Sequence, residues 1–357
     1  MSASVLKLDD FPYSKPGYGK KVAVVAVGSA GCKIANELSK QSKLLEHFLY
    51  VTCDDIDIAN ITSGERILVD AIGKGKESPY NVRGLFAPYL SELRHQIRDS
   101  QLVFLIAGLG GTVGSGIAPI VAREACSKDA ITVAILVMPF SFEKTKHFFA
   151  GGALKQIAKH VDGIIIIDNE ELLQKDLAII DAYAEVNQKV SVSLNKLLGS
   201  TEDHEYSVGL NNIVNFVRTK SYSVLCLGDS GSEISEHKQA VINAASHFDN
   251  TVDKREASKS IVHLCTEKSI AMTDLISSIG GLSGILGNGT MSIEYGLSAN
   301  STTTTTAIIV ATGFTKTRFD KFDPVDSILE AAGKANLETG IDEAVEVSTL
   351  LYQIERE

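Results

Sequence analysis

The chain of 357 residues lacks an excess of basic residues, and this absence limits what it can bind. It has 34 Lys and Arg against 44 Asp and Glu, which gives a net charge of −10 at pH 7. Contacts to nucleic-acid phosphates need clustered Lys and Arg. The basic residues form no block longer than the few lysines around Lys74 and Lys144. We therefore expect no nucleic-acid partner.

Long hydrophobic runs and paired cysteines are also missing. No apolar run reaches the roughly 18 residues of a membrane-spanning helix, and the polar N-terminal residues show no apolar signal segment. The five cysteines contain no CxxC pair, and such a scattered, odd set argues against a zinc site and a disulfide framework. It fits a reducing compartment. We expect a cytoplasmic protein without a transmembrane segment.

The sequence does have enough hydrophobic residues, 44%, for a large core, and a length that suits two domains. In its first half, apolar runs typical of buried parallel strands alternate with helical patterns. The expected strands are Lys21–Val27, His47–Cys53, Leu102–Ala107, Ala130–Met138 and Gly163–Ile167, and the helices between them include Pro79–Asp99 and Ile117–Cys126. This alternation predicts a doubly wound α/β domain whose ligands bind beyond the carboxyl ends of the strands.

The second half begins with a long amphipathic helix. Apolar residues spaced by three and four from Ile179 to Leu197 predict one helix, which Gly199 ends. The expected strands after it are Tyr222–Leu227, Ser260–Thr266, Met291–Leu297 and Thr305–Thr312. We divide the chain into a first domain (1–178), the central helix and its loop (179–204), an α+β domain (205–315) and an acidic, partly helical tail (316–357).

The stretch Gly108–Gly116 holds five glycines in nine residues, between a predicted strand and a predicted helix. Glycines let the backbone approach an anion closely, and a helix start offers free N–H groups at the positive end of its dipole. The hydroxyls of Thr112 and Ser115 add further donors. A flexible tight turn is the alternative, but the position at a strand-to-helix junction favours phosphate binding.

A second junction, Gly28–Gly31, carries a weaker signal. It fits a degraded dinucleotide fingerprint, with Ala26 in place of the first glycine and Asp54 as the acid for the ribose. It fits equally well a helix start with small residues for close packing. Two such junctions in one sheet exceed what a dinucleotide-binding domain requires, because that domain needs one diphosphate loop.

Several segments, in the same order along the chain, resemble the tubulin/FtsZ superfamily. These segments, within the span from Val22 to about Gly313, are Val27–Leu38, Ala107–Pro119, Met138–Glu143, Asp168–Leu173 and Asp181–Asn187. They resemble, in turn, the first phosphate loop, the glycine-rich signature loop, the FtsZ segment before the ribose contact, the segment whose asparagine reads guanine, and the start of the central helix. The resemblance implies the tubulin/FtsZ fold, a GTPase domain over 1–178, and bound GTP or GDP, with Mg²⁺ held through the nucleotide.

The resemblance also implies roles for individual residues. The phosphates would be held at Gly28, Ser29, Ala30, Gly31, Cys32, Gly108, Gly110, Gly111, Thr112, Val113, Gly114, Ser115 and Gly116. Glu143 would bind the ribose hydroxyls, with His147 nearby where FtsZ usually has arginine. Asn169 and Asn187 would bond the base, and Tyr183, one turn from Asn187, would stack on it. From the residues alone, Asn169 is equally a helix N-cap and Tyr183 plain core.

Further loops would lie near the base side and the terminal phosphate. They contribute Asp54 and the glycines and lysines Gly73, Lys74, Gly75 and Lys76. Lys74 and Lys76 could pair with phosphate oxygens, although such lysines are more often simply solvated.

The sequence departs from the family in the loop that activates hydrolysis in a neighbouring subunit. Its two acidic positions read Gly209 and Asn212 here, and neither side chain can serve as a charged base. Loss of such groups usually costs orders of magnitude in rate. A shift of register would return Asp203 or Glu205 to the site. In the signature loop, Val113 lacks the hydroxyl that FtsZ places near the terminal phosphate.

Three hypotheses follow. The leading one is a GTP- or GDP-binding cytoskeletal protein of cell division or cell shape that forms head-to-tail filaments, with hydrolysis slow or lost. The second is an active, self-stimulated GTPase that uses Asp203 or Glu205. The third, a NAD-dependent oxidoreductase, leaves Gly108–Gly116 unexplained. For the tail, Ile341–Ile354 predicts an acidic helix packed on the body, with a partner-binding peptide as the alternative.

Overall fold

The computed structural model describes residues 22–42, 44–45, 47–71, 78–128, 130–173, 177–198, 208–231, 237–266, 270–287, 289, 291–299 and 304–322. Several predicted features lie outside these residues: Gly73, Lys74, Gly75, Lys76, Gly199, Asp203, Glu205 and the tail helix Ile341–Ile354.

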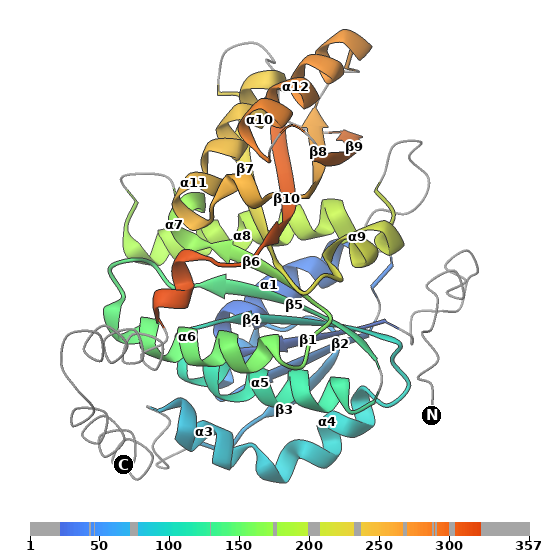
Figure 1. The fold of residues 1–357 in the computed structure, drawn as a ribbon. Helices are drawn as coiled ribbons and strands as arrows, with labels where there is room; N and C mark the ends of the chain where they lie inside the picture. Colours follow the sequence, from blue (N-terminus) through green and yellow to red (C-terminus); the bar gives the residue numbers. More distant parts are fainter. Residues whose placement is uncertain are drawn as a thin grey trace, which may run out of the picture.

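One sheet of ten strands runs through the molecule in the order β3-β2-β1-β4-β5-β6-β7-β10-β8-β9 (Figure 1). The first six strands pair in parallel. They are β1 (Val22–Val27), β2 (His47–Thr52), β3 (Glu65–Leu68), β4 (Leu102–Gly108), β5 (Ile131–Met138) and β6 (Gly163–Asp168). Strands β1, β5 and β6 are buried along their whole length, which explains their unbroken apolar sequences. The predicted doubly wound parallel sheet is confirmed.

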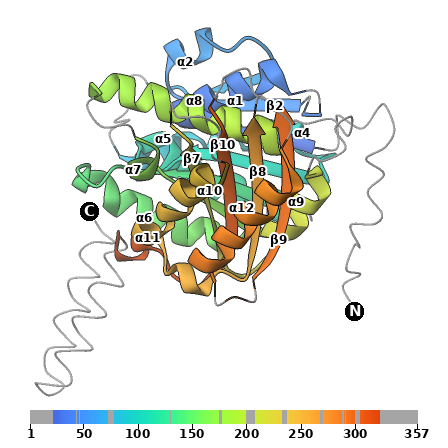
Figure 2. The same cartoon turned by 90° about the horizontal axis from the view of Figure 1, so that it is seen from above.

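The sheet continues into a mixed second region. Strand β7 (Tyr222–Asp229) pairs in parallel with β6, and β10 (Thr306–Phe314) lies antiparallel between β7 and β8 (Lys259–Thr266). Strand β9 (Ser292–Ala299) pairs in parallel with β8 at the edge. Seen from above, α10 (His237–Ser246) and α12 (Met272–Ile285) pack over this part (Figure 2).

Helices cover both faces of the sheet and form two separate hydrophobic cores. One face is covered by α1 (Gly28–Gln41), α8 (Ile179–Leu198) and α9 (Leu210–Val217). The other is covered by α3 (Pro79–Leu85), α4 (Leu90–Gln96), α5 (Thr112–Cys126) and α6 (Lys144–Ala158), then by α10 and α12. Short helices complete the fold: α2 (Asp55–Ala59), α7 (Asn169–Leu172) and α11 (Phe248–Thr251), with the 3-10 turns η3 (Ala87–Tyr89), η4 (Lys254–Glu256) and η5 (Arg318–Phe322).

The structure differs from the sequence-based expectation at two helices. The single helix expected over Pro79–Asp99 is divided into α3, η3 and α4, and a proline stands in the first turn of η3. Helix α5 begins at Thr112, five residues before the expected Ile117. The glycine-rich stretch is therefore half loop and half first helical turn.

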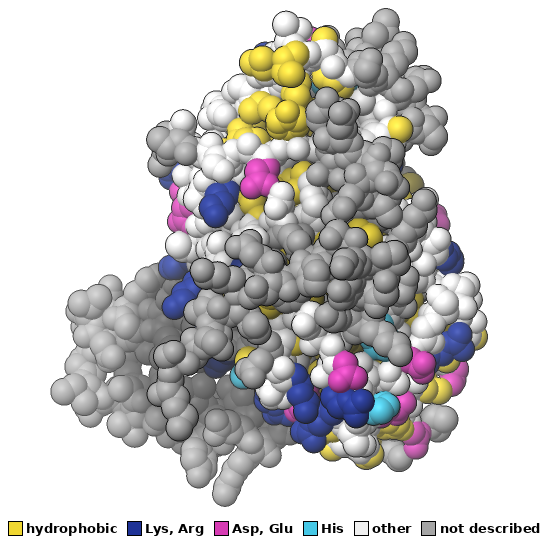
Figure 3. All heavy atoms as spheres, turned by 90° about the vertical axis from the view of Figure 1, so that its right-hand side faces the viewer, with side chains coloured by type: hydrophobic (Ala, Val, Ile, Leu, Met, Phe, Trp, Pro, Cys, Tyr) yellow, Lys and Arg dark blue, Asp and Glu magenta, His cyan; other side chains and the backbone are white. Residues whose placement is uncertain are grey.

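The face seen in Figure 3 has an uneven distribution of side chains. Hydrophobic side chains gather on its upper part, and Lys and Arg side chains lie among Asp and Glu side chains on its lower part. Within the part of the chain that the structure describes, no helix is both long and apolar enough to cross a membrane.

Candidate functional site

A cavity of about 590 Å³ opens at the carboxyl ends of the parallel strands, where doubly wound sheets bind their ligands. It is lined by parts of both glycine-rich junctions together with residues of α6, α7 and α8. The predicted site residues on its wall are Gly28, Ser29, Ala30, Gly108, Gly111, Thr112, Val113, Gly114, Glu143, Asn169, Tyr183 and Asn187. Segments more than 150 residues apart in the sequence thus meet at one cavity.

The two glycine junctions lie against each other. Gly28 has φ +74°, and a Cβ there would stand 3.1 Å from the backbone nitrogen of Gly114. A Cβ on Gly114 would stand 2.0 Å from the carbonyl oxygen of Gly108, a distance that no side chain tolerates. Both positions therefore require glycine, because another backbone occupies the space of a side chain.

The helices that start at these junctions have no side-chain caps. Helix α1 begins at Gly28 and α5 begins after Gly111, and at neither start does a side chain of the described residues accept from the first N–H groups. By contrast, Asp54 caps α2 and Ser78 caps α3. Two uncapped helix starts that face one cavity leave N–H donors for an anion.

Other glycines of the two motifs serve packing. A Cβ on Gly31 would stand 2.4 Å from the carbonyl oxygen of Ile106, and one on Gly116 would stand 2.6 Å from that of Pro79. Gly110 has φ +91° and donates its N–H to Ser115 Oγ at 2.8 Å. The predicted residues that are not on the cavity wall are Gly31, Cys32, Asp54, Gly110, Ser115, Gly116 and His147.

The phosphate-side hydroxyl of Ser29 already has a partner. It donates to Asp57, a buried acid of α2 that also accepts from Thr52 Oγ1 at 3.3 Å. Asp54, the acid that the sequence singled out, is instead the N-cap of α2 and accepts from Ile56 N at 2.8 Å. Cys32 lies on the buried face of α1, and burial raises the pKa of its thiol.

Glu143 is the centre of a polar cluster on the opposite wall. Its Oε2 accepts from the N–H of Phe140 at 2.9 Å, and its Oε1 accepts from the Tyr183 hydroxyl and lies 2.5 Å from Lys146 Nζ. Burial raises the pKa of Glu143, but the hydrogen bonds from Lys146 and Tyr183 outweigh it, so the pKa lies below its usual value. A ribose hydroxyl that donated to the Glu143 carboxylate would share it with Phe140 N–H, Tyr183 and Lys146.

Asn169 lines the cavity and is buried, and its Oδ1 has no hydrogen-bond partner among the described residues. It is the first residue of α7, and the cap of that helix is Asp168, which accepts from Glu170 N at 3.1 Å. The N-cap interpretation of Asn169 is therefore wrong. A buried amide oxygen without a partner costs free energy unless a ligand or water donates to it.

Tyr183 and Asn187 lie one turn apart on α8, and both face the cavity. The Tyr183 ring also packs edge-on against Phe140, with 5.2 Å between the ring centroids. Burial raises the pKa of its hydroxyl, and the neighbouring Glu143 raises it further, so it remains a donor.

Sequence reasoning missed two lysines on the cavity wall, Lys33 of α1 and Lys146 of α6. Lys33 lies four residues after Ser29 on the same helix face, so helical periodicity could have identified it. The cavity thus has cations near both glycine junctions and near Glu143. In the described residues, no group of three or more His, Cys, Asp or Glu side chains is arranged to hold a metal ion.

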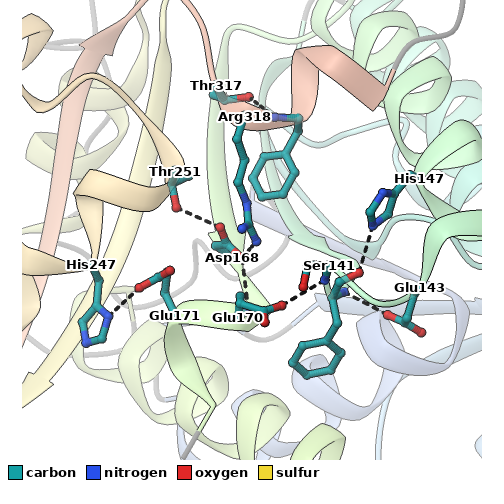
Figure 4. A network of polar contacts seen from close by, with 12 residues as sticks. Ser141, Glu143, His147, Asp168, Glu170, Glu171, His247, Thr251, Thr317 and Arg318 are labelled. Atoms are coloured by element: carbon teal, nitrogen blue, oxygen red, sulfur yellow. Dashed lines mark hydrogen bonds and ion pairs between the residues drawn. The ribbon is translucent and has the colours of Figure 1, made fainter.

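His147 does not line the cavity. Its Nε2 lies 2.9 Å from the Phe140 carbonyl oxygen, and its ring stacks on Phe322 with 3.7 Å between centroids. Figure 4 shows both His147 and Glu143 joined by dashed lines to the segment that carries Ser141, where their partners are the carbonyl oxygen and the N–H of Phe140.

Gly209 and Asn212 lie far from the cavity. Gly209 precedes α9, and Asn212 is exposed in the first turn of that helix. Helix α9 packs at the amino end of β6, where a Cβ on Gly163 would stand 2.6 Å from the Val217 carbonyl oxygen, whereas the cavity opens at the carboxyl ends of the strands. Asn212 therefore cannot complete the cavity of its own chain.

The fold and this cavity place the chain among doubly wound α/β proteins whose sheet continues into a mixed second region. The family model described as "Tubulin/FtsZ family, GTPase domain" matches residues 21–175. The predicted resemblance to the tubulin/FtsZ superfamily is confirmed over this part of the chain.

Relatives of known name also point to this family, although their sequence identity to the chain is modest. The mitochondrial division protein fszB of Dictyostelium discoideum is 26% identical over 274 residues, which are 73% of this chain and 75% of that protein. Cell division protein FtsZ 1 of Pyrococcus abyssi is 32% identical over 167 residues, 43% of each chain. The latter match spans less than half of the relative.

Solved structures share the fold. An empty FtsZ dimer from M. jannaschii has a TM-score of 0.69 at 21% identity and covers 82% of this chain and 88% of its own. A GTPγS-bound protofilament of CetZ2 from Haloferax volcanii has a TM-score of 0.67 at 19% identity and covers 89% of this chain and 100% of its own.

Proposed function

We propose that this chain binds GTP or GDP in the cavity, and that residues 1–178 form the nucleotide-binding part and residues 205–315 the second domain. The observation that carries the proposal is the meeting of two uncapped helix starts, those of α1 and α5, with the unpartnered amide of Asn169 in one cavity. The helix starts suit phosphates. The Asn169 oxygen is an acceptor, which suits a donor such as the exocyclic amino group of guanine.

The remaining wall residues complete the proposed site. Backbone N–H groups of the glycine junctions, helped by Lys33, would hold the phosphates, and Mg²⁺ would come with the nucleotide. Asn187 would bond the base beside Tyr183, which would stack on it. Glu143 would accept from the ribose alongside its present partners.

We further propose that the subunits assemble head to tail, in a cytoskeletal role in cell division or cell shape. The distance between Asn212 and the cavity supports this, because only another subunit could bring α9 to a bound nucleotide. Large hydrophobic side chains are exposed beside the cavity, with Ile180 at 82%, Ile179 at 61% and Phe142 at 57%, and a subunit contact would cover them. The FtsZ dimer and the CetZ2 protofilament named above are assemblies of this fold.

Hydrolysis would be slow or lost, because Gly209 and Asn212 bring no carboxylate to the neighbouring subunit. Phosphate release that rises faster than linearly with protein concentration, and is abolished by alanine at Asp203 and Glu205, would favour the alternative of an active GTPase.

The test is direct. Purified protein is assayed for bound nucleotide, then titrated with labelled GTP, GDP, ATP and NAD, and sedimented with each nucleotide. We expect micromolar or tighter binding of GTP and GDP and nucleotide-dependent pelleting.

Asn187→Ala should weaken GTP binding about tenfold, the cost of one lost hydrogen bond to a buried ligand. Asn195→Ala, on α8 but bonded to Gln41 at 3.2 Å, is the matched control. If neither GTP nor GDP binds, the proposal fails.

A further inference from the structure

The segment after β10 returns to the cavity side of the molecule. Residues 317–322, which we call the C-terminal strap, comprise Thr317 and η5. Thr317 forms an isolated bridge with Val252, and Phe319 is completely buried in the hydrophobic core. Figure 1 shows η5 beside α6, below the second region. The strap therefore links the last strand to the helices that frame the base and ribose sides of the cavity.

Arg318 makes the first contact, on the base side. Its Nη2 donates to Asp168 Oδ1 at 2.6 Å, and the carboxylate is 2% exposed. The other oxygen of Asp168 accepts from Thr251 at 2.8 Å (Figure 4). Asp168 caps α7, whose first residue is Asn169. Because Arg318 and Thr251 hold both oxygens of the cap, they determine where Asn169 presents its amide.

Phe322 makes the second contact, on the ribose side. Its ring stacks on His147 at 3.7 Å between centroids, and the interplanar angle is 8°. His147 in turn bonds the carbonyl oxygen of Phe140, whose N–H donates to Glu143. The strap thus reaches Glu143 through the side chains of Phe322 and His147 and the backbone of Phe140.

We propose that the strap positions the base and ribose contacts of the nucleotide site, with Arg318 and Phe322 as its positioning residues. The proposal rests on the proposed GTP binding and adds a component that lies outside the cavity. Neither residue lines the cavity. Both act through a neighbour: Arg318 through Asp168 on Asn169, and Phe322 through His147 on Glu143. FtsZ usually has arginine at the position of His147. In this chain His147 instead connects Phe322 to the backbone of Phe140.

The experiment measures nucleotide preference as well as affinity. Dissociation constants for GTP, ITP and 2′-deoxy-GTP are determined for the wild type, Arg318→Ala, Arg318→Lys and Phe322→Ala. ITP lacks the exocyclic amino group, so it reports on Asn169, and 2′-deoxy-GTP reports on the ribose contact. Arg255→Ala removes an exposed Arg–Asp pair of 2.7 Å and Phe148→Ala removes a half-exposed ring of α6, so these are matched controls.

We expect Arg318→Ala to shrink the preference for GTP over ITP by about tenfold, with partial rescue in Arg318→Lys. Phe322→Ala should instead shrink the preference for GTP over 2′-deoxy-GTP. Thermal unfolding shows whether each variant is folded. If Arg318→Ala does not fold, the preference of Phe322→Ala for GTP over 2′-deoxy-GTP tests the proposal. Folded variants with wild-type preferences would overturn the strap proposal alone, whereas a wild type that binds no GTP would overturn the proposed function as well.

Discussion

Tyr183 donates a hydrogen bond to Glu143 across 40 residues of sequence. The bond joins α8 to the start of α6, which are the proposed base and ribose walls of the cavity. The Tyr183 ring lines the cavity between its contact with Phe140 and the Lys146 ammonium, which lies 5.5 Å from the ring centroid. The two walls are thus connected before any ligand enters.

Replacing Tyr183 by phenylalanine should lower the free energy of unfolding by about 1 kcal/mol, the usual net value of one hydrogen bond. The ring and its packing on Phe140 remain, and Glu143 keeps Lys146 as a partner. Urea denaturation measures the change. Tyr80→Phe is the control, since Tyr80 is 60% exposed. Equal stabilities for both variants would show that the Tyr183 bond contributes nothing.

The lowered pKa of Glu143 predicts a pH-dependent contribution to stability. The folded-state pKa lies below the reference value of 4.5, so the stabilising effect is complete above pH 4.5 and is lost as the pH falls through the folded-state pKa. The difference in unfolding free energy between the wild type and Glu143→Gln should therefore be largest near neutral pH and shrink below pH 4.5. The other carboxylates titrate in both proteins, so their contributions cancel in the difference in unfolding free energy. A difference that stays constant from neutral pH to pH 3 would refute this account.

Gly114→Ala and Gly111→Ala should behave differently, although both glycines line the cavity. A Cβ on Gly114 meets the Gly108 carbonyl oxygen at 2.0 Å, whereas one on Gly111 meets no atom within 4 Å. We expect Gly114→Ala to destabilise the fold by more than about 2 kcal/mol, because the backbone must move, and Gly111→Ala to stay within about 0.5 kcal/mol. Thermal unfolding measures both. Similar melting temperatures would contradict the close approach of Gly114 to the Gly108 carbonyl oxygen.

Asn212→Asp should raise GTP turnover if the proposed assembly and the aligned position are correct. The substitution restores a carboxylate in the first turn of α9, where a neighbouring subunit would present it to the nucleotide. We expect at least about a tenfold increase that depends on protein concentration. Asn215→Asp, exposed on the same helix, supplies the same charge at a different place. An equal response in both variants, or none in either, would rule out the role of position 212.

The buried parts of the fold could be predicted because their sequence patterns are local. Strands such as Val22–Val27 and Ile131–Met138 are apolar on both faces, and only a covered parallel strand explains that pattern. Strand β3 (Glu65–Leu68) was missed, since one of its four residues is buried and it carries no such signal. The early start of α5 was missed because glycines usually end helices, whereas here Gly114 and Gly116 are required by neighbouring backbones.

The candidate site was predictable only in part for a related reason. A glycine pattern shows that a backbone comes close to something, but not to what: Gly31 and Gly116 meet other peptide groups, and Gly111 faces the cavity. The link between Arg318 and Asp168 spans 150 residues and has no local motif. Only the folded chain brings those two side chains together.

That span has a consequence for the order in which the protein matures. Every described residue of the cavity wall lies before position 188, so a growing chain carries all of them long before Arg318 emerges from the ribosome. Contacts of such long range form late in folding. Until the strap arrives, Asp168 has no cation to hold, and newly made chains would handle guanine nucleotides less selectively than finished ones. The proposed selectivity for guanine nucleotides would then be complete only after the last residues of the strap have been synthesised.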